Sequence, residues 1–463
     1  MMRSLLPFVL ILFTITSPIL GQSSTTELGY QDFIERVFEH HPEAVVANLI
    51  ETRALAKLSE SRGNFDPQFF IDISEKKFDQ KDYYGLREMG LVVPTVLGLK
   101  FDAGLERNRG VFLNPENSTP SDGLYYAGVS LPILQGLITD KRRTALAKAK
   151  ALAQVGEAEK DLALATLHYN ASNAYYNWCA AYLKLNIYKD ALFAARTRYN
   201  AVVNSYYLGD KPAIDTVEAG IQVANRQVDL NNQIIKLFKA KNDLETYLWQ
   251  NGYLPLELDS NTIPRVRDFY ARDFDSKLDS LQFPLLRALK GEIAATKTEL
   301  RWAREQIKPT LNLKYQVLNS ASLQPNELRY QGLDNNYKWG LEFTFPILIR
   351  EARGKSRFYA AKTESLERKY QSKEREIENK VEVNIQALEI LKQQQKLVDR
   401  NVANYNELLG AERTLFQNGE SSLFLVNARE QGWLKSQIDR IDNVLKTANS
   451  ELELGLIYGY YKN

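Results

Sequence analysis

The sequence predicts a mainly α-helical protein that also contains a transmembrane β-barrel. Three observations lead to this prediction. Two very long stretches read as continuous helices, short stretches between them alternate apolar and polar residues, and the whole pattern occurs twice along the 463 residues. We therefore expect a duplicated unit of helix, strands, long helix, turn and helix.

The duplication is visible in proline-centred motifs that recur at fixed distances. Pro42 and Pro284 are 242 residues apart, and so are Pro67 and Pro309. The later motifs "SLPIL" and "TFPIL" are only 214 residues apart. The difference of 28 residues indicates an extra hairpin in the first copy, which we place at about 77–108, near the outer end of the strand region.

The two copies set the boundaries of the expected elements. The first repeat spans 22–250, with barrel strands at about 64–134, a long helix at 137–207, a turn at 208–213 and a helix at 213–250. A connector at 251–281 precedes the second repeat at 282–463, with strands at about 309–347, a long helix at 349–417, a turn at 417–421 and a helix at 421–455.

Each expected long helix would measure about 100 Å, because an α-helix rises 1.5 Å per residue. In the second one, apolar side chains follow spacings of three and four residues, as in Leu388, Leu391, Val398 and Val402, which is the pattern of a coiled coil. In the first one, large and small residues alternate along one seam, which favours close antiparallel packing. Cys179 belongs to this seam, so we expect a buried small side chain rather than a reactive thiol.

The beginning of the chain has the features of a secretory signal peptide at residues 1–21. It has one positive charge at Arg3, a mostly apolar run from Leu5 to Leu20, and the small Gly21. The single cysteine excludes an intramolecular disulfide. No later apolar run is long enough for a transmembrane helix, so a membrane-spanning part would have to be a β-barrel. The formal net charge of +2 gives no reason to expect nucleic acid as a partner.

The strand pattern is clearest in "LNLKYQVL", where Leu311, Leu313, Tyr315 and Val317 alternate with mostly polar residues. "KWGLEFTF" alternates in the same way, and "LGLKFDAGLE" inside the insertion is equally regular. Such alternation is typical of a transmembrane barrel with an apolar outer face, and also of a half-buried sheet in a soluble protein. The signal peptide and the lack of disulfides favour the barrel.

A barrel of this kind has to be assembled from several copies of the chain. Two strand pairs per chain cannot close, and open strand edges do not occur in lipid. Two copies would give eight strands and almost no bore, whereas three copies give twelve strands around an open lumen. We therefore expect a homotrimer whose 12-stranded barrel continues into a long α-helical coiled-coil tunnel, with the glycine turns at the end far from the membrane.

The duplication, the "LPIL" and "FPIL" strand ends and the turn "GDKPAID" together resemble the TolC-type outer-membrane efflux proteins. The resemblance covers essentially the whole chain after the signal peptide. It implies a trimeric channel-tunnel in the outer membrane of Gram-negative bacteria, surrounded by outer-membrane lipid and with a long periplasmic extension. It also implies a tripartite efflux or type I secretion system, completed by a periplasmic adaptor and an inner-membrane transporter, with no enzymatic activity and no cofactor.

The resemblance also assigns candidate site residues at the two helix turns. Aspartates just after the turns help to close the periplasmic end in this family, and here the gate candidates are Asp215, Glu218 and Asn427. The second copy departs from the family pattern, because Leu425 and Asn427 stand where acidic residues are frequent and Ser421 replaces a basic one. The tips expected to touch the adaptor are Gly209, Asp210, Lys211, Gly419, Glu420 and Ser421.

Asp215 has a second interpretation. Asp215 and Glu218 form a capping-box pattern, in which the aspartate accepts backbone N–H bonds at a helix start and the glutamate reaches back. Other chemistry is poorly represented. The histidines His40, His41 and His168 lack metal-ligand spacing, and no nucleotide-binding or catalytic motif occurs. The basic "DKRR" stretch fits either an anchor at the membrane interface or a solvated helix start.

Two other classes of protein also contain long coiled coils. One is a non-channel surface spacer or adhesin, which predicts a single long repeat and a distinct terminal head. The other is the periplasmic adaptor protein itself, which predicts one helical hairpin flanked by β-rich domains. The tandem organisation with two hairpins favours the channel over both.

Overall fold

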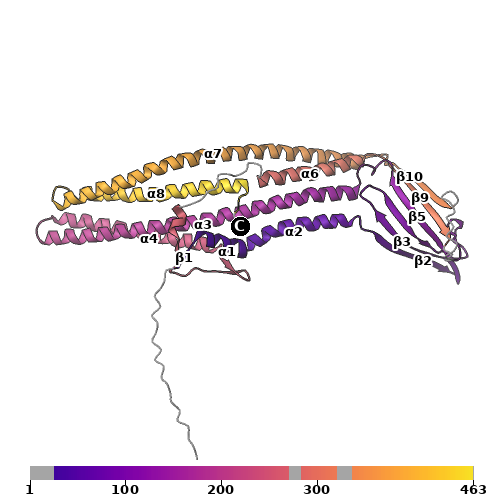
Figure 1. Ribbon diagram of the computed structural model, residues 1–463, viewed down its shortest axis with the longest axis horizontal. Helices are drawn as coiled ribbons and strands as arrows, with labels where there is room; N and C mark the ends of the chain where they lie inside the picture. The colour runs from indigo at the N-terminus through magenta and orange to yellow at the C-terminus, as the bar shows by residue number, and fades with distance from the viewer. Residues whose placement is uncertain (1–25, 271–282, 321–335, 462–463) are drawn as a thin grey trace, which may run out of the picture.

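The chain forms an elongated body in which helices run lengthwise and one large sheet lies at one end (Figure 1). The computed structural model describes residues 26–270, 283–320 and 336–461. The expected signal peptide, residues 1–21, therefore lies outside the described residues. Within the described ranges, no helix combines the length and the apolar character that a bilayer crossing requires.

Two of the described helices are much longer than the others. The long helices α3 and α7 contain 67 and 68 residues, so each is about 100 Å long. The bounds are α1 Tyr30–His40, α2 Pro42–Gly63, α3 Lys141–Tyr207, α4 Ala213–Glu245, α5 Val266–Tyr270, α6 Pro284–Glu305, α7 Arg350–Gln417 and α8 Leu423–Tyr458, with a short 3₁₀ helix at Pro115–Asn117.

Helix starts are set by proline and by polar caps. Pro42 and Pro284 occupy the first positions of α2 and α6, where the missing N–H would have no partner in the helix. Asp140 caps α3, because its side chain accepts a hydrogen bond from the backbone N–H of Arg143 at 2.8 Å. The Arg143 guanidinium in turn donates to the carbonyl of Leu137 at 3.0 Å. The "DKRR" stretch is therefore a capped helix start.

The helix α3 is the one on which most other helices pack. Near the sheet it contacts α2 and α6, and nearer the far end it contacts α4 and α8 (Figure 1). The packing is close: a Cβ added to Gly156 would lie 2.5 Å from the Cβ of Ala54, and one added to Gly291 would lie 2.5 Å from a methyl of Val155. The small residues of the expected seam are fully buried: Ala158, Ala165, Ser172 and Cys179.

The helix α7 lies at the outside of the body and packs on α6 and α8 (Figure 1). Its buried side chains include six members of the expected coiled-coil seam: Ile377, Asn384, Leu388, Val402, Leu409 and Glu412. Large apolar side chains elsewhere on α7 are exposed in the single chain, among them Val383, Ile385 and Ile390.

The largest buried cluster lies where α1, α5, the end of α4 and part of α8 pack against α3. It contains Phe33 of α1, Tyr175 and Trp178 of α3, and Phe269 of α5. The Tyr175 hydroxyl donates a hydrogen bond to the backbone carbonyl of Leu28 at 2.9 Å. The short strands of this region are β1 Glu27–Leu28, β6 Trp249–Gln250, β7 Leu254–Pro255 and β8 Ile263–Pro264.

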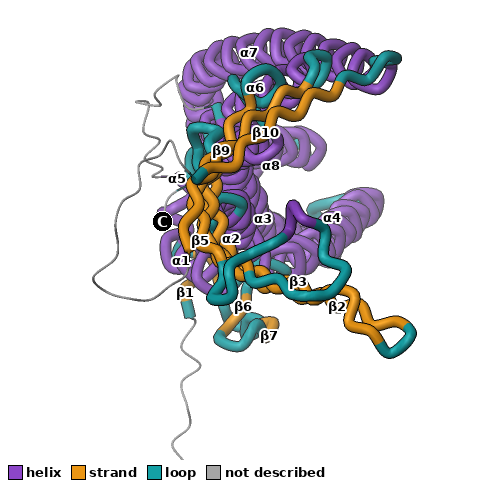
Figure 2. The backbone as a smooth tube through the Cα atoms, turned by 90° about the vertical axis from the view of Figure 1, so that its right-hand side faces the viewer, coloured by secondary structure: helices purple, strands orange, loops and turns teal. Residues whose placement is uncertain are grey.

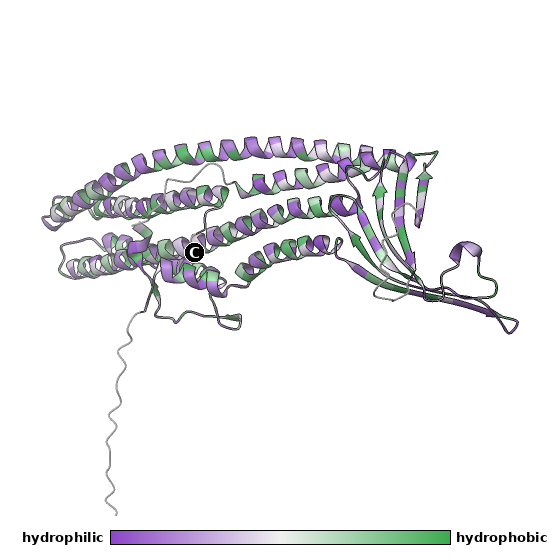
Figure 3. Cartoon of the chain, turned by 45° about the vertical axis from the view of Figure 1, so that its right-hand side comes forward, coloured by the Kyte–Doolittle hydropathy of each residue, from purple (hydrophilic) through white to green (hydrophobic). Residues whose placement is uncertain are grey.

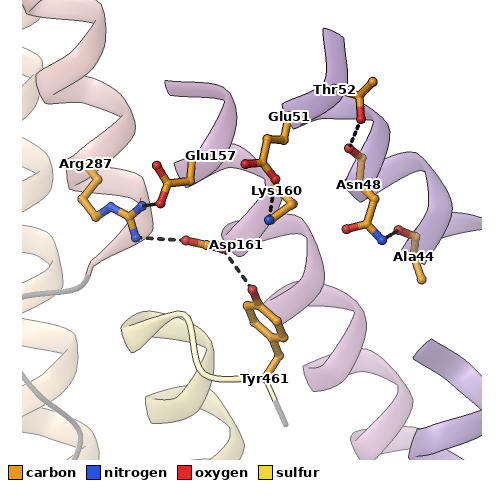
Figure 4. A network of polar contacts seen from close by, with 9 residues as sticks. All are labelled: Ala44, Asn48, Glu51, Thr52, Glu157, Lys160, Asp161, Arg287 and Tyr461. Carbon is orange, nitrogen blue, oxygen red and sulfur yellow. Dashed lines mark hydrogen bonds and ion pairs between the residues drawn. The ribbon is translucent and has the colours of Figure 1, made fainter. Parts of the chain in front are cut away.

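The shorter helices stack end to end along the long ones. The end of α8 meets the start of α6, where a Cβ added to Gly459 would collide with the ring of Pro284. Helix α3 holds both sides of this joint. Asp161 accepts hydrogen bonds from Arg287 of α6 at 2.9 Å and from Tyr461, just beyond α8, at 3.0 Å (Figure 4).

The first repeat has a matching joint between α4 and α2. His41 caps α2, because its Nδ1 accepts a hydrogen bond from the N–H of Glu43 at 3.1 Å. The His41 ring stacks on Tyr247, just beyond α4, with 5.7 Å between ring centres. Helix α3 also holds α2 through an ion pair of Lys160 with Glu51 at 2.6 Å (Figure 4).

The large sheet contains six antiparallel strands in the order β10-β9-β5-β4-β3-β2. It bends into an open arc with β10 and β2 at its two ends (Figure 2). Within the described residues, each of these two end strands has a strand neighbour on one side only. The bounds are β2 Gln68–Phe78, β3 Lys81–Pro94, β4 Lys100–Glu106, β5 Leu124–Pro132, β9 Thr310–Ser320 and β10 Tyr337–Thr344.

The structure contains a hairpin within 77–108, as expected, but the expectation of four sheet strands per chain, with this hairpin placed near the outer end, is wrong. The inserted residues supply two full strands, β3 and β4, which lie inside the sheet between β2 and β5. Alternation in the sequence shows which face a residue occupies but not which strand lies beside it, so the position of the hairpin within the sheet is not visible in the pattern. The insertion therefore widens the sheet.

The two faces of the sheet differ in polarity, as the alternating colours along its strands show (Figure 3). Directly paired residues point to the same face, so the register assigns the faces. One face is apolar and largely exposed in the single chain, with Phe69, Ile71, Met89, Leu91, Phe101, Tyr125, Trp339, Leu341 and Phe343. The other face is mainly polar, with Asp72, Glu88, Lys100, Asp102, Lys314, Gln316, Lys338 and Glu342.

A buried histidine gives the helical body a measurable pH dependence. The Nε2 of His168 in α3 lies 3.3 Å from the Tyr30 hydroxyl, and the Phe38 ring stacks against the imidazole. Burial lowers the pKa of His168 from 6.5 to about 4. Protons therefore bind more readily to the unfolded chain, so this contribution to stability is complete above pH 6.5 and is lost as the pH falls toward 4.

We expect His168→Gln to remove this pH-dependent contribution. As the pH falls from 6.5 toward 4, this group should lower the free energy of unfolding of the wild type by about 3 kcal/mol. The variant should not show this decrease. The measurement is the thermal unfolding midpoint of detergent-solubilised protein as a function of pH. The matched control, His40→Gln, should keep the wild-type dependence. Equal pH dependence in His168→Gln and wild type would contradict the assignment.

Candidate functional site at the helix turns

The two helical hairpins end in matching turns, at the end of the body far from the sheet (Figure 1). Helix α3 is followed by Gly209 at φ +83° and α7 by Gly419 at φ +79°, a left-handed conformation that glycine adopts without steric strain. In each turn the next residue, Asp210 or Glu420, donates its N–H to the carbonyl five residues earlier at 2.9 Å. The two turns therefore share one geometry.

The expected tip residues lie at the surface and close to one another. Lys211 and Ser421 are half-buried, and the exposed ones are Gly209, Asp210, Gly419 and Glu420. The Lys211 ammonium is 4.8 Å from the centre of the Phe416 ring at the end of α7, which is a cation–π distance. An apolar cluster joins α3, α4 and α8 beneath the turns: Val202, Ala219 and Leu423.

The capping-box interpretation of Asp215 is wrong. Helix α4 begins at Ala213 and has Pro212 as its N-cap residue, without a side-chain cap hydrogen bond. Asp215 thus lies inside the first turn, where a negative charge is favourable beside free backbone N–H groups. The side chain of Glu218 does not reach back to the helix start, because it bonds to Asn427 instead.

Glu218 and Asn427 belong to a polar cluster that joins three helices. Asn427 of α8 donates through Nδ2 to Oε1 of Glu218 in α4 at 3.1 Å, and its Oδ1 accepts from Arg198 of α3 at 2.7 Å. The same guanidinium pairs with Glu430 of α8. Asn427 and Glu430 are 8% and 3% exposed, so the polar groups are shielded from water. We call Arg198, Glu218, Asn427 and Glu430 the tip cluster.

A second buried carboxylate closes the second hairpin on itself. Glu412 of α7 accepts a hydrogen bond from the Ser421 hydroxyl at 2.5 Å, and it also accepts one from Nε of Arg429 in α8 at 3.3 Å. Ser421 thus ties the second turn to α7 without a charge of its own. The tip cluster joins the two hairpins, whereas Glu412 joins the two helices of one hairpin.

Of the predicted gate residues, the structure brings Glu218 and Asn427 together and leaves Asp215 outside their cluster. The positively and negatively charged residues of the cluster, Arg198 and Glu430, do not stand out in the sequence. A signal for both exists, because Arg198 lies 11 residues before Gly209 and Glu430 lies 11 residues after Gly419. Residues equally far from two adjacent turns lie at the same height, so opposite charges at equal distances are candidates for contacts between hairpins.

The site can join helices but offers little for catalysis or metal binding. Throughout the described ranges, no group of three or more His, Cys, Asp or Glu side chains is placed to hold a metal ion. Cys179 is buried, and burial raises the pKa of its thiol, which makes it a poor nucleophile. The expectation of a buried small side chain at Cys179 is confirmed.

Residues 281–459 match the family described as outer membrane efflux protein. No curated protein matches the sequence. Similar solved structures share the fold at low sequence identity. The outer membrane channel CmeC of Campylobacter jejuni has a TM-score of 0.65 at 14% identity, over 93% of this chain and 85% of that chain.

Two further solved structures are similar over most of their length. The open state of the MtrE outer membrane channel of Neisseria gonorrhoeae has a TM-score of 0.65 at 15% identity, over 93% of this chain and 88% of that chain. The outer membrane protein VceC of Vibrio cholerae has a TM-score of 0.64 at 14% identity, over 93% of this chain and 96% of that chain.

Loss of Arg198 should loosen the tips. Arg198→Ala leaves Glu430 buried without its cation, which destabilises such a site by about 3 kcal/mol. We expect correspondingly faster amide hydrogen exchange in the first turns of α8. Arg196→Ala is the control, because Arg196 is exposed on the same helix and bonds to the half-buried Gln227, outside the tip cluster, at 2.8 Å. Unchanged exchange in α8 of Arg198→Ala would show that the tip cluster does not hold these helices together.

Proposed function

We propose that this chain, a member of the outer membrane efflux protein family, forms an export duct that lies in the outer membrane and extends into the periplasm. The observation that carries the proposal is a curved sheet with one apolar and one polar face, joined directly to two long helical hairpins. Such a sheet suits a barrel wall with lipid outside and water inside. The helices suit a tunnel wall that continues the same passage.

The apolar face of the sheet supports a membrane location. On the end strand β10, Trp339, Leu341 and Phe343 are 61%, 55% and 62% exposed in the single chain, and Ile71 and Ile73 on the opposite end strand are 59% and 65% exposed. Apolar surface of this extent is unfavourable in water and marks an interaction site. Lipid of the outer membrane would cover it.

Closure of the sheet requires further copies of the chain. The free sides of β2 and β10 carry backbone N–H and C=O groups, and each unsatisfied group costs several kcal/mol in lipid. Pairing β10 of one copy with β2 of the next copy would satisfy them. With six strands per chain, two copies would already supply twelve strands, so the strand count does not fix the number of copies. We propose three copies, as the family resemblance implies.

The helices also present surfaces that a second copy would cover. The helical part is curved like the sheet, with α7 and α4 at its two lateral ends (Figure 2). Exposed apolar residues lie on both of these helices: Val217, Ile221, Val228, Ile235 and Phe238 on α4, and Val383, Ile385 and Ile390 on α7. Neighbouring copies that pack α4 against α7 would bury these side chains and close the tunnel wall.

We propose that the tip cluster keeps the periplasmic end of the tunnel closed. Arg198 and Asn427 hold α8 against α3, and the bond from Asn427 to Glu218 holds it against α4. Opening would separate α8 from these two helices. Asp215 is half-buried in the first turn of α4, and we assign it the role of a negative charge at the narrow end of the passage.

The partners follow from the exposed turns and from the family. We propose that a periplasmic adaptor contacts Gly209, Asp210, Lys211, Gly419, Glu420 and Ser421 and links the duct to an inner-membrane transporter. In this arrangement cargo enters at the helix-turn tips and leaves through the barrel that the sheets form together. Tripartite efflux and type I secretion use the same kind of duct, and the transporter selects between them.

The copy number can be measured directly. We expect the protein without residues 1–21 to be a trimer in detergent, as the family resemblance implies. Light scattering should give about three times the mass of one chain. A stable dimer would overturn the copy number and keep the barrel, whereas a monodisperse monomer would overturn the barrel and favour a spacer or adhesin.

The gate can be tested by conductance in planar bilayers. Asn427→Ala removes the bonds to Arg198 and Glu218, so we expect a higher open probability. Asp215→Asn keeps the shape but removes the charge, so it should reduce cation preference and leave open probability unchanged. Arg196→Ala serves as the control and should behave like the wild type. A wild-type open probability in Asn427→Ala would overturn the role of the tip cluster, and wild-type selectivity in Asp215→Asn would overturn that of Asp215.

A further inference from the structure

We propose that the inserted hairpin, strands β3 and β4, is part of the barrel wall, so that the assembled barrel has eighteen strands instead of twelve. This inference rests on the proposed trimeric duct, because three copies of a six-stranded sheet supply eighteen strands. The alternative is a twelve-stranded wall in which β2 pairs directly with β5, while the insertion folds into the lumen as a plug or projects outside. Four observations favour the wall.

The first observation is the continuous backbone ladder. Strands β3 and β4 pair with each other from Glu88 opposite Glu106 to Pro94 opposite Lys100. On the two outer sides, β3 pairs with β2 along its length, and β4 pairs with β5 from Lys100 to Glu106. Removal of the hairpin from the sheet would therefore break two ladders, β2–β3 and β4–β5, and form one, between β2 and β5.

The second observation is that both faces continue through the insertion. Met89 and Leu91 of β3 and Phe101 of β4 lie on the apolar face, between Ile71 of β2 and Tyr125 of β5. They are 45%, 43% and 46% exposed in the single chain. A plug would be surrounded by water or by the polar inner wall and would have no use for an apolar stripe in register with its neighbours.

The third observation is a set of polar contacts that cross the polar face between strands. Asp102 of β4 receives a hydrogen bond from the Gln316 side chain of β9, two strands away, and its carboxylate is 3.8 Å from the Lys314 ammonium. The intervening strand β5 has Gly128 at this point, and a Cβ there would collide with the Gln316 side chain. The glycine lets the two repeats connect across β5 on the inner surface.

A similar contact crosses β4. The Tyr126 side chain of β5 lies over Gly104 of β4 and Gly90 of β3, where an added Cβ would lie 2.7 Å and 2.9 Å from the hydroxyl oxygen. Its hydroxyl donates to Oε1 of Glu88 in β3 at 2.6 Å. The Tyr126 side chain thus links β5, β4 and β3. It fits there only because positions 90 and 104 carry no side chain. Tyr126 is 6% exposed, so it lies flat on the wall and leaves the lumen open.

The fourth observation concerns the inner turn of the insertion, between β3 and β4. A Cβ added to Gly98 in this turn would lie 2.9 Å from the Arg143 guanidinium. Arg143 also donates to the carbonyls of Leu137 and Gly136, in the link between β5 and α3. The turn is therefore docked at the junction of sheet and helices, where a wall strand has to reverse.

The added strands change the dimensions of the duct. Barrel diameter grows roughly in proportion to strand number, so eighteen strands give a barrel about one and a half times as wide as twelve. The helical tunnel gains nothing from the insertion, because the inserted residues contain no tunnel helix. The barrel would then not be the part that limits the size of the cargo, and the limit would lie in the helical part.

The test uses single cysteines in a Cys179→Ala background, with trimers reconstituted into lipid bilayers. Leu91→Cys and Val92→Cys probe the two faces of the insertion, and Leu341→Cys and Glu342→Cys probe the two faces of β10. A spin label is attached to each cysteine, and its accessibility to two reagents is measured. Oxygen partitions into lipid and reports lipid exposure, and a water-soluble nickel complex reports water exposure. We expect lipid exposure at 91 and 341, and water exposure at 92 and 342.

Two outcomes separate the inference from the proposed function. Water exposure at both 91 and 92, with normal alternation at 341 and 342, would overturn the eighteen-stranded wall and leave the duct standing. Loss of alternation at 341 and 342 would overturn the membrane sheet itself.

A disulfide gives a second measurement. Ala103 and Ala127 are directly opposite in β4 and β5, so Ala103→Cys with Ala127→Cys should form an intrachain bond in folded trimers under oxidation. Folded trimers without this bond would mean that β5 has another neighbour, as in the twelve-stranded arrangement.

Discussion

Close packing along α3 is the constraint on which the rest of the structure depends. One helix of 67 residues contacts α2 and α6 along one part of its length and α4 and α8 along the other. Large side chains on several sides would keep those neighbours apart, so the seam is rich in alanine and includes Gly156, while Gly291 provides the same clearance from α6. The joints between the shorter helices, α8 with α6 and α4 with α2, both lie against this helix, which contacts them through Asp161 and Lys160.

Much of the fold could be predicted from the sequence because its signals are periodic and long. The coiled-coil spacing of α7, the small seam of α3 and the repeated proline motifs each extend over many residues, so local exceptions do not hide them. The place of the inserted strands within the sheet was harder to predict. Alternation indicates which face a residue occupies but not which strand lies beside it, and Gly90, Gly104 and Gly128 carry no polarity at all, although each is required where a neighbouring side chain crosses its strand.

The candidate site was predictable only in part, for a related reason. Glu218 and Asn427 stood near the turns, but their contact depends on how two hairpins lie relative to each other, which no local pattern records. Arg198 and Glu430 are ordinary charges on helices until the two turns are set side by side. The capping box failed because Pro212 starts α4 earlier than the Asp215 pattern implies. Propensity sets where a helix can start, and proline decided it here.

The end-to-end joints have a mechanical consequence for the helical wall. At the meeting of α8 with α6 and of α4 with α2, no run of intrahelical hydrogen bonds crosses the gap, because the backbone ladder of each helix stops at its own terminal residues. Resistance to bending and twisting at these joints therefore comes from the two uninterrupted helices, α3 and α7, together with side-chain clamps such as Asp161. Any rotation of the tips relative to the sheet will therefore be concentrated at the level of these two joints. There only α3 and α7 are continuous, whereas above and below the joints all the helices are.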